Sequence, residues 1–317
     1  AASAVMRLLP EPRVRVAGGT IRFEGREIYS LSSAEMRSLR GSRMAMIFQE
    51  PMAALNPQKR IGWQIEEVLR IHTSLSRKER RARVLEILEQ VRIPDPASTI
   101  NAYPHQISGG QRQRVMIAMA LILQPKLIIA DEPTTALDVT TQLQILKLIR
   151  DLQSQFDTGV LFITHDFGVV AEIADRVAVL RHGELVEQGA ASDVLNRPKH
   201  PYTQALIAAV PDLRPPKPKK LEGAPVVLRV DGLRKVFKPK RSLFGAKRNE
   251  VVAVDDVSFV LRKGETLGIV GESGSGKTTV SRCITRLIEP DGGSVKLGDT
   301  DVLSASRSEL RALRRHV

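Results

Sequence analysis

The chain has 317 residues, of which 42% are hydrophobic and 26% are charged, a composition typical of globular proteins. Its longest apolar run, Val115 to Leu123, is far shorter than the roughly 20 residues that a membrane-spanning helix needs. The single cysteine, Cys283, excludes an intramolecular disulfide and a multi-cysteine metal site, and it favours a reducing compartment.

The net charge of +13 is concentrated in one part of the chain, because residues 211–250 carry twelve Lys or Arg and only four Asp or Glu. A local charge run of this kind is typical of a solvated linker. Aromatic residues make up only 4% of the chain and do not alternate with the basic ones. We therefore do not expect nucleic acid to be a partner.

The first third of the chain predicts a hairpin, a strand and a helix. Residues 18–28, GGTIRFEGREI, predict a two-stranded hairpin with its turn at Glu24 and Gly25. The run MAMIFQEP over 44–51 predicts a strand that ends near Gln49. An amide there can contact metal and water, although a lone glutamine at a strand end usually has no function. Residues 76–91 predict a partly exposed helix.

A serine and two glycines precede a long apolar helix in ISGGQRQRVMIAMALIL, residues 107–123. Free backbone N–H groups and the Ser108 hydroxyl at a helix start can bind an anion. The alternative is an ordinary N-cap with a flexible turn, and the segment taken by itself favours this alternative.

Two further apolar runs end in polar side chains. LIIADEP, residues 127–133, predicts a strand that ends at Asp131 and Glu132, at the strand end where ligands bind in open α/β sheets. Asp131 could hold Mg²⁺ through water, and Glu132 could orient and deprotonate an attacking water. The alternative is a strand that leaves the core and meets solvent. VLFITHD, residues 160–166, predicts a strand ending at His165, which could contact a phosphate or serve as a structural donor.

A proline-rich segment divides the chain. Residues 211–225 contain five prolines, which favour extended, semi-rigid backbone. The strand-like run VVLRV follows at 226–230. We therefore predict a first domain over 1–210, a linker over 211–225 and a second segment over 226–317.

The stretch GESGSGKTT fits the phosphate-loop pattern G-x-x-x-x-G-K-[ST]. ETLGIV, residues 265–270, predicts a strand before it, and residues 277–288 predict a helix after it. Backbone N–H groups would wrap the phosphates, Lys277 would reach the β- and γ-phosphates, and the Thr278 hydroxyl would ligate Mg²⁺. The alternative is a glycine-rich loop beside a solvated lysine. The predicted nucleotide-binding residues are Gly271, Glu272, Ser273, Gly274, Ser275, Gly276, Lys277, Thr278 and Thr279.

Three segments occur twice, at an offset of about 274 to 279 residues. RLLPEP matches RLIEPD, GGTIRFEGREI matches GGSVKLGDTDV, and EMRSLR matches ELRALR; the first copies begin at residues 7, 18 and 35. A domain-sized period predicts two similar domains in tandem. We expect residues 1–210 to be a first copy without its phosphate loop, and 226–317 to be the first part of a second copy.

Taken in chain order, these pieces resemble the motifs of ATP-binding cassette (ABC) ATPases. Gln49 resembles the Q-loop residue, and the rest resemble the signature (Ser108, Gly109, Gly110, Gln111), Walker B (Asp131, Glu132), the D-loop (Asp138), the switch histidine (His165) and Walker A. Ile107 replaces the usual leucine, and Thr135 stands where the D-loop often has serine. The resemblance implies an α/β P-loop NTPase fold with a mixed sheet core and a helical signature subdomain. It also implies binding and hydrolysis of ATP with Mg²⁺, held by Thr278, Asp131 and Gln49.

Three segments resemble the oligopeptide/dipeptide importer branch of that family: FQEPMAALNP (48–57), NRPKHPYTQALIAAVP (196–211) and the basic insert KPKRSLFGAKRNE (238–250). Some members of this branch fuse two cassettes for dipeptide or glutathione-type import. The resemblance implies a bacterial protein at the cytoplasmic face of the inner membrane, with integral permease subunits and a separate substrate-binding protein.

The same resemblance assigns further roles. Residues 56–105 would form the lobe that contacts the permease. An aromatic side chain would stack on adenine, with Phe237 the first candidate and Phe244 the second, and core packing as the alternative. The tail has no cysteine for an iron–sulfur centre, so we expect none.

The family implies two cassettes packed head to tail. Lys277 and Thr278 of one copy would then face the signature of the other across one nucleotide, while Gln49, Asp131, Glu132 and His165 would serve the second site. Two alternatives stay open. Residues 226–288 could dock onto a first copy, or the protein could be a non-transport cassette ATPase that acts on nucleic acid or the ribosome.

Overall fold

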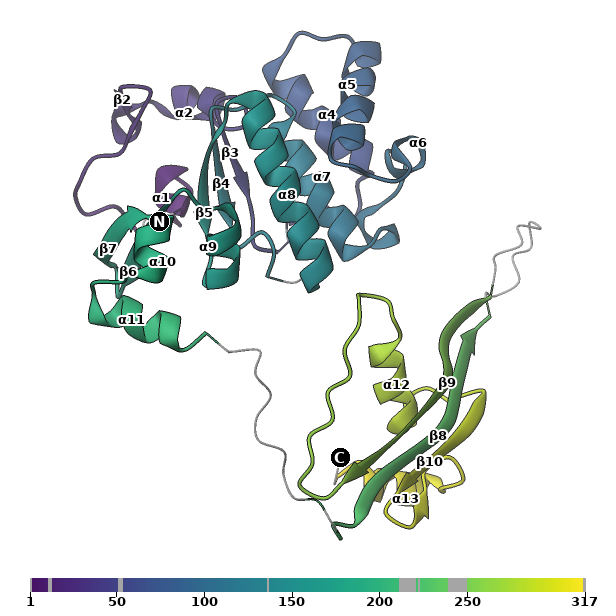
Figure 1. Ribbon diagram of the computed structural model, residues 1–317. Helices are drawn as coiled ribbons and strands as arrows, with labels where there is room; N and C mark the ends of the chain where they lie inside the picture. Colours follow the sequence, from purple (N-terminus) through teal and green to yellow (C-terminus); the bar gives the residue numbers. More distant parts are fainter. Residues whose placement is uncertain are drawn as a thin grey trace. The chain divides into compact units, whose positions relative to one another are not determined.

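The computed structural model describes residues 2–10, 13–50, 54–135, 137–210, 221, 223–238 and 250–315. Contacts divide the chain into two compact units, Ala1–Pro211 (unit one) and Asp212–Val317 (unit two), each with its own sheets and core (Figure 1). No helix in the described ranges has the length and apolar character that a bilayer span requires.

A three-stranded parallel sheet forms the centre of unit one. Its strands lie in the order β3 (Met44–Ile47), β4 (Leu127–Asp131) and β5 (Gly159–Ile163). Successive side chains point to opposite faces, so Ala45 and Ile128 enter one core cluster while Met44 and Ile129 enter another. Apolar residues on both faces are typical of a parallel strand covered on both sides. The strands predicted at 44–51, 127–133 and 160–166 are therefore confirmed.

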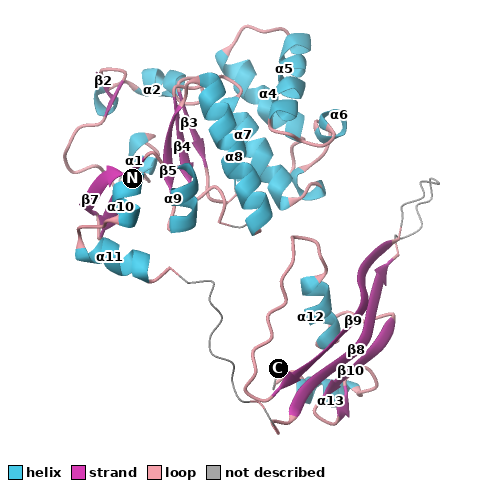
Figure 2. Ribbon diagram, viewed as in Figure 1, coloured by secondary structure: helices cyan, strands magenta, loops and turns pink. Residues whose placement is uncertain are grey.

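Helices cover one face of this sheet, as Figure 2 shows. Their buried side chains form the largest core cluster together with that face. The 76–91 prediction is confirmed by α5, whose first turn is closed by a capping box between Ser76 and Glu79. The helical elements of this part are α4 (Ile61–His72), α5 (Arg77–Gln90), α6 (Pro96–Thr99), η2 (Pro104–Gln106), α7 (Gly109–Leu121) and α8 (Val139–Phe156).

The other face of the sheet is covered by elements within residues 2–10 and 13–40. Met6, Ile28 and Met36 pack with Met44 and Ile129 in a second core cluster. The predicted hairpin is present, with its turn at Glu24 and Gly25. The elements are α1 (Ala2–Val5), β1 (Arg22–Phe23), β2 (Arg26–Glu27), η1 (Ile28–Ser30) and α2 (Ser33–Leu39).

The segment HPYT, residues 200–203, begins a helix whose start is hydrogen-bonded to a hairpin. Pro201 lies in the first turn of α11, where its missing N–H costs no hydrogen bond. The Glu187 carboxylate on β7 accepts hydrogen bonds from the backbone N–H groups of Lys199 (2.8 Å) and His200 (3.1 Å). The elements here are α9 (Phe167–Ile173), β6 (Arg176–Arg181), β7 (Glu184–Ala190), α10 (Ala191–Asn196) and α11 (Pro201–Ala208).

Unit two is an antiparallel sheet with two short helices. Its strand order is β11-β10-β8-β9, and its core includes Val230, Val280 and Cys283. The basic insert lies between β8 and β9, and residues 239–249, with Phe244, fall outside the described residues. The elements are β8 (Val226–Phe237), β9 (Val251–Arg262), α12 (Lys277–Ile284), β10 (Gly292–Leu297), β11 (Thr300–Asp301) and α13 (Arg307–Leu313).

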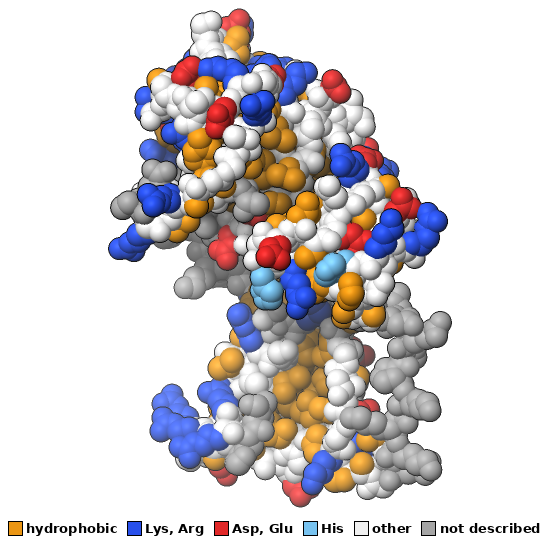
Figure 3. Space-filling model, turned by 90° about the vertical axis from the view of Figure 1, so that its left-hand side faces the viewer, with side chains coloured by type: hydrophobic (Ala, Val, Ile, Leu, Met, Phe, Trp, Pro, Cys, Tyr) orange, Lys and Arg blue, Asp and Glu red, His pale blue; other side chains and the backbone are white. Residues whose placement is uncertain are grey.

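Two expectations about the sheets are wrong for the described residues. Residues 265–270 form no strand, and each sheet is wholly parallel or wholly antiparallel, so no mixed sheet is present. A strand requires ladder hydrogen bonds from a neighbouring backbone, and no described strand pairs with this segment. Its apolar side chains therefore stay exposed, including Val270 at 91%, and Figure 3 shows apolar side chains at the surface of both units.

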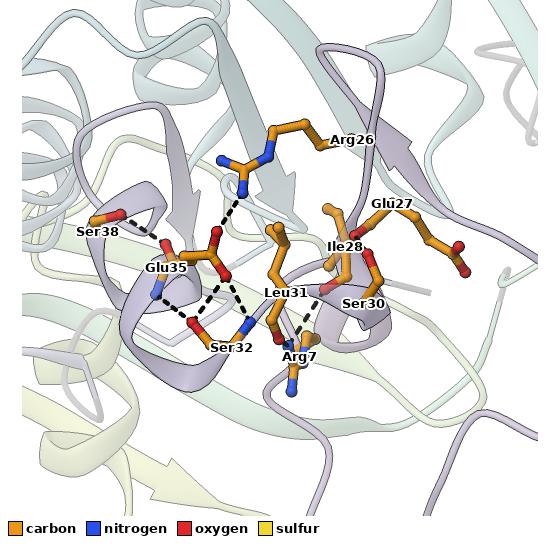
Figure 4. A network of polar contacts seen from close by, with 9 residues as sticks. All are labelled: Arg7, Arg26, Glu27, Ile28, Ser30, Leu31, Ser32, Glu35 and Ser38. Carbon is orange, nitrogen blue, oxygen red and sulfur yellow. Dashed lines mark hydrogen bonds and ion pairs between the residues drawn. The ribbon is translucent and has the colours of Figure 1, made fainter.

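The segments that match in sequence fold alike. Hairpin β10–β11 turns at Gly298 and Asp299 and resembles hairpin β1–β2. Each hairpin is followed by a helix closed by a capping box, made by Ser32 and Glu35 on α2 (Figure 4) and by Ser306 and Glu309 on α13.

Candidate functional site

Three side chains converge on Glu132, directly after β4. The Gln49 amide donates to one carboxylate oxygen at 2.8 Å and the Thr135 hydroxyl donates to the same oxygen at 3.0 Å. His165 Nδ1 lies 3.0 Å from the other oxygen. Gln49 and His165 reach Glu132 because they follow β3 and β5, whose carboxyl ends flank that of β4.

The backbone at Glu132 is held in an uncommon conformation. Its φ is 46°, which costs a residue with a Cβ about 1 kcal/mol or more. The Glu132 N–H donates to the carbonyl of Ile163 at 2.9 Å, at the end of β5, and this bond fixes the turn. Strain of this kind concentrates at functional sites. It aims the Glu132 carboxylate at the two neighbouring strand ends.

The environment of Glu132 keeps its carboxyl ionised. The hydrogen bond from His165 lowers the pKa of Glu132 most; Thr135 and Gln49 lower it further, against the opposing effect of burial. The Glu132 side chain is 22% exposed, whereas the His165 ring is 70% exposed and accessible. A carboxylate with a lowered pKa stays charged near neutral pH and is a weak base. A charged carboxylate held in this way can orient a water molecule.

Asp131 and Asp138 have different settings. Asp131 is the last residue of β4 and is half-buried. Asp138 caps α8, because its carboxylate accepts from the Thr141 N–H at 3.0 Å and the Thr141 hydroxyl at 2.9 Å. Across the described ranges, no group of three or more His, Cys, Asp or Glu side chains could hold a metal ion. Mg²⁺ commonly takes one or two protein ligands together with phosphate oxygens and waters. The donor types of Asp131 and of the exposed Thr278 hydroxyl fit that mode.

The signature segment forms the start of α7, with Ser108 as its N-cap. The Ser108 side chain accepts from the Gln111 N–H at 3.2 Å, and the Gln111 side chain accepts from the Ser108 N–H at 2.9 Å. Gly110 allows α7 to approach α8, because a Cβ at this position would lie 2.8 Å from the Thr141 methyl carbon. The signature and the Asp138 cap therefore meet through Thr141. Anion binding by Ser108, Gly109, Gly110 and Gln111 stays a prediction.

The phosphate loop is in unit two, at the start of α12. Lys277 is the first residue of that helix, and its ammonium donates to the carbonyls of Gly271 and Glu272 at 2.7 Å each. It also lies 3.3 Å from the Ser275 hydroxyl. The N-terminal end of a helix favours negative charge. A positive side chain held over a loop at such an end fits a phosphate group.

Gly276 is required by the packing of this loop. Its φ is 95°, and a Cβ there would lie 2.1 Å from the carbonyl oxygen of Ala253 on β9. Because that oxygen belongs to a backbone strand, it cannot turn aside as a side chain could. Glycine is therefore the residue that permits this loop geometry.

We expect Gly276→Ala to abolish nucleotide binding, because the added methyl forces the loop away from β9. The measurement is titration of the chain with a fluorescent ATP analogue. Gly298→Ala is the matched control: it also has positive φ, at 57°, but nothing lies within 4 Å of its Cβ. Wild-type affinity in Gly276→Ala would contradict this account of the loop.

Phe237 is at the end of β8 with its ring accessible. The residue is 42% exposed, and the Lys235 ammonium lies 5.8 Å from the ring centroid. Core packing, the alternative for this residue, is therefore not what the structure shows. Stacking on adenine stays a prediction.

The structure thus brings Gln49, Glu132 and His165 together, and sequence reasoning missed Thr135 as their fourth member. The signal in the sequence was the spacing: the Thr135 hydroxyl follows the Glu132 carboxylate by three residues, close enough to hydrogen-bond to it. Two pairs of arginines were also missed: Arg7 and Arg40 in unit one, and Arg286 and Arg314 in unit two. Each pair makes hydrogen bonds within its own unit, and all four arginines lie in the repeated segments.

Comparison with protein families gives two matches. The model described as ABC transporter matches residues 3–135 and 254–317. The model described as the C-terminal region of the oligopeptide/dipeptide transporter matches residues 186–240.

Among similar proteins are the glutathione import ATP-binding proteins GsiA of Escherichia coli K12 and Shigella boydii serotype 4. Each is 46% identical over 351 residues, which covers 100% of this chain and 55% of the relative. The chain therefore spans about half the length of these curated relatives.

Solved structures of ATP-binding cassettes are also similar. One is the dimeric MJ0796 cassette bound to ADP and Pi, with 30% identity and a TM-score of 0.50 over 55% of this chain and 74% of that one. Another is CbiO1 of Clostridium perfringens, described as part of the cbiONQ transporter complex, with 27% identity and a TM-score of 0.50 over 57% of this chain and 69% of that one. The chain therefore belongs to the ABC transporter family and has the α/β P-loop fold of its ATP-binding cassettes.

Proposed function

We propose that this chain is the ATP-binding and ATP-hydrolysing part of an importer for peptides of the dipeptide, oligopeptide or glutathione type. We also propose that it contains parts of two cassettes in tandem, residues 1–210 and 226–317 joined by the linker 211–225. The observation that carries the ATPase is the Lys277 ammonium held at 2.7 Å over the Gly271 and Glu272 carbonyls at the start of α12. The matched C-terminal region at 186–240 supports the peptide branch.

In this proposal one nucleotide is held from two sides. The loop over residues 271–279 binds the phosphates, with Lys277 on the β- and γ-phosphates. The signature at Ser108 to Gln111 closes on the same nucleotide from the sister cassette. Both segments are glycine-containing starts of helices, α12 and α7, so each offers partial positive charge to a phosphate.

The Glu132 cluster serves hydrolysis. Glu132 orients the attacking water, and Gln49 and His165 hold the carboxylate and reach toward the γ-phosphate. Mg²⁺ would neutralise charge on the phosphates at each nucleotide, with Thr278 among its contacts at one and Asp131 among its contacts at the other. Because Gln49, Asp131, Glu132 and His165 lie in unit one and the loop lies in unit two, the repeat assigns them to the two different nucleotides of a tandem protein.

The proposed partners are integral permease subunits and a separate substrate-binding protein, at the cytoplasmic face of a bacterial inner membrane. The lobe at residues 56–105 would contact the permease. This lobe carries exposed apolar side chains on α4, Trp63 at 41% and Ile71 at 67%. Exposed apolar residues of this size suit a protein contact.

The test is ATP hydrolysis by the tandem protein reconstituted with its permease in lipid. We expect a binding protein loaded with glutathione or a dipeptide to raise the rate. No response to any loaded binding protein would contradict import. Salt-sensitive retention on nucleic acid would instead favour the non-transport alternative, in which the basic segment at 211–250 makes the contact.

A further inference from the structure

Two arginines close the repeated segment of unit one. Arg7 follows α1 and has a φ of 48°, and its guanidinium donates to the carbonyls of Leu31 at 2.7 Å and Ile28 at 3.3 Å (Figure 4). Arg40, just after α2, returns to the end of α1, where its guanidinium donates to the carbonyls of Met6 at 2.8 Å and Arg7 at 2.5 Å. The segment after α1 is thereby joined to η1 through Arg7 and to the end of α2 through Arg40.

The same four hydrogen bonds occur in unit two. Arg286 follows α12 with a φ of 49°, and it donates to the carbonyls of Ala305 at 2.6 Å and Val302 at 3.3 Å. Arg314, just after α13, donates to the carbonyls of Thr285 at 3.0 Å and Arg286 at 2.8 Å. Each bond uses the same guanidinium nitrogen as its counterpart in unit one. We call the pair Arg286 and Arg314 the arginine lock.

Arginine is suited to this position for two reasons. The last carbonyls of a helix have no partner within the helix, and they carry the negative end of its dipole. A planar guanidinium can donate to two carbonyls at once, which a lysine ammonium does less well. Two arginines held close together repel each other, which costs free energy. In unit two the Glu289 carboxylate, 2.8 Å from the Arg286 guanidinium, reduces this repulsion.

In unit two the helix that is locked is the one that carries the phosphate loop. Helix α12 has only eight residues, Lys277–Ile284. Val280 and Cys283 bury one side of it in the core. The lock joins Thr285 and Arg286, directly after α12, to the segment between β11 and α13 and to the end of α13. With both the buried side of α12 and its C-terminal end fixed, the direction of the first turn is fixed as well.

We propose that Arg286 and Arg314 are positioning residues of the nucleotide site. They hold the C-terminal end of α12, so that Lys277 and the loop before it keep the geometry that receives the phosphates. Neither arginine touches the nucleotide. This inference rests on the proposed function, in which the loop at 271–279 binds ATP.

The chain provides its own probe to separate positioning from simple stabilisation. Cys283 is the single cysteine of the sequence, and it is fully buried on α12. Its reaction rate with a thiol reagent therefore reports whether α12 has left the core. The affinity for a fluorescent ATP analogue reports the geometry of the loop.

The experiment compares Arg314→Ala, Arg314→Lys and Arg286→Ala with the wild-type chain. We expect the alanine variants to bind the analogue about tenfold more weakly while Cys283 stays as protected as in wild type, since each loses two charge-assisted hydrogen bonds far from the ligand. Arg314→Lys should recover part of the loss. Arg40→Ala, which breaks the same contacts in unit one, is the matched control and should leave the affinity unchanged.

Each other outcome has a definite meaning. Unchanged affinity in Arg314→Ala and Arg286→Ala, with Cys283 protected, overturns the positioning role and leaves the proposed function standing. Affinity that falls only as Cys283 becomes reactive also overturns it, because the lock then serves only stability. A wild-type chain that does not bind the analogue overturns the proposed function itself.

Discussion

Lys277→Ala is expected to weaken ATP binding by about 100-fold, which corresponds to about 2.7 kcal/mol. The Lys277 ammonium is held over the loop by the carbonyls of Gly271 and Glu272, in the position from which it would reach the phosphates. Charge-assisted hydrogen bonds to phosphate are among the stronger polar contacts, at about 1.5–3 kcal/mol each. The measurement is titration of the chain with a fluorescent ATP analogue.

Lys263→Ala is the control for this substitution. Lys263 is an exposed lysine of the same unit, outside the loop and the lock. It changes the net charge by the same amount, so a general electrostatic effect would appear in both variants. Equal affinity in Lys277→Ala and Lys263→Ala would show that the loop does not bind the phosphates.

Glu132→Gln is expected to lower ATP hydrolysis at its site by a factor of about 100 to 1,000, while nucleotide binding is retained. The amide has nearly the same shape but cannot hold the charge that Gln49, Thr135 and His165 surround. Because the proposal places Glu132 and the Lys277 loop in different copies, the measurement is phosphate release by the tandem protein with both cassettes whole.

The control is Glu172→Gln, which removes a carboxylate from an exposed position on α9. It should leave the rate of phosphate release unchanged. If Glu132→Gln hydrolyses ATP at its own site as fast as wild type, the convergence on Glu132 has another purpose.

The strands of the parallel sheet in unit one were predictable from the sequence, because the local pattern of apolar residues determines them. The strands at 44–47 and 127–131 have buried apolar residues on both faces, as a continuous apolar run predicts, whereas Leu161 in the strand at 159–163 is 42% exposed. The convergence of Gln49, Glu132 and His165 was also predictable in outline. Their motifs end neighbouring strands, and the carboxyl ends of parallel strands share one edge.

Features that depend on contacts with residues far away in the sequence were not predictable. Residues 265–270 have the composition of a buried strand, but pairing needs a neighbouring backbone that the local pattern does not report. The arginine lock and the matching pair in unit one, Arg7 and Arg40, were missed for a related reason. A side chain that binds carbonyls 16 to 34 residues away has no local signature, even though Arg7 and Arg286 stand at matching places in the repeat.

The central claim, that the signature and the phosphate loop hold one nucleotide from opposite sides, is tested most directly by cross-linking in the tandem protein. Ser108→Cys and Ser273→Cys are introduced together with Cys283→Ser, so that the new thiols are the ones measured in this part of the chain. We expect a disulfide between positions 108 and 273 when ATP is bound, and little of it with ADP or without nucleotide. Nucleotide binding without that cross-link, or an equal yield with and without ATP, would contradict the account.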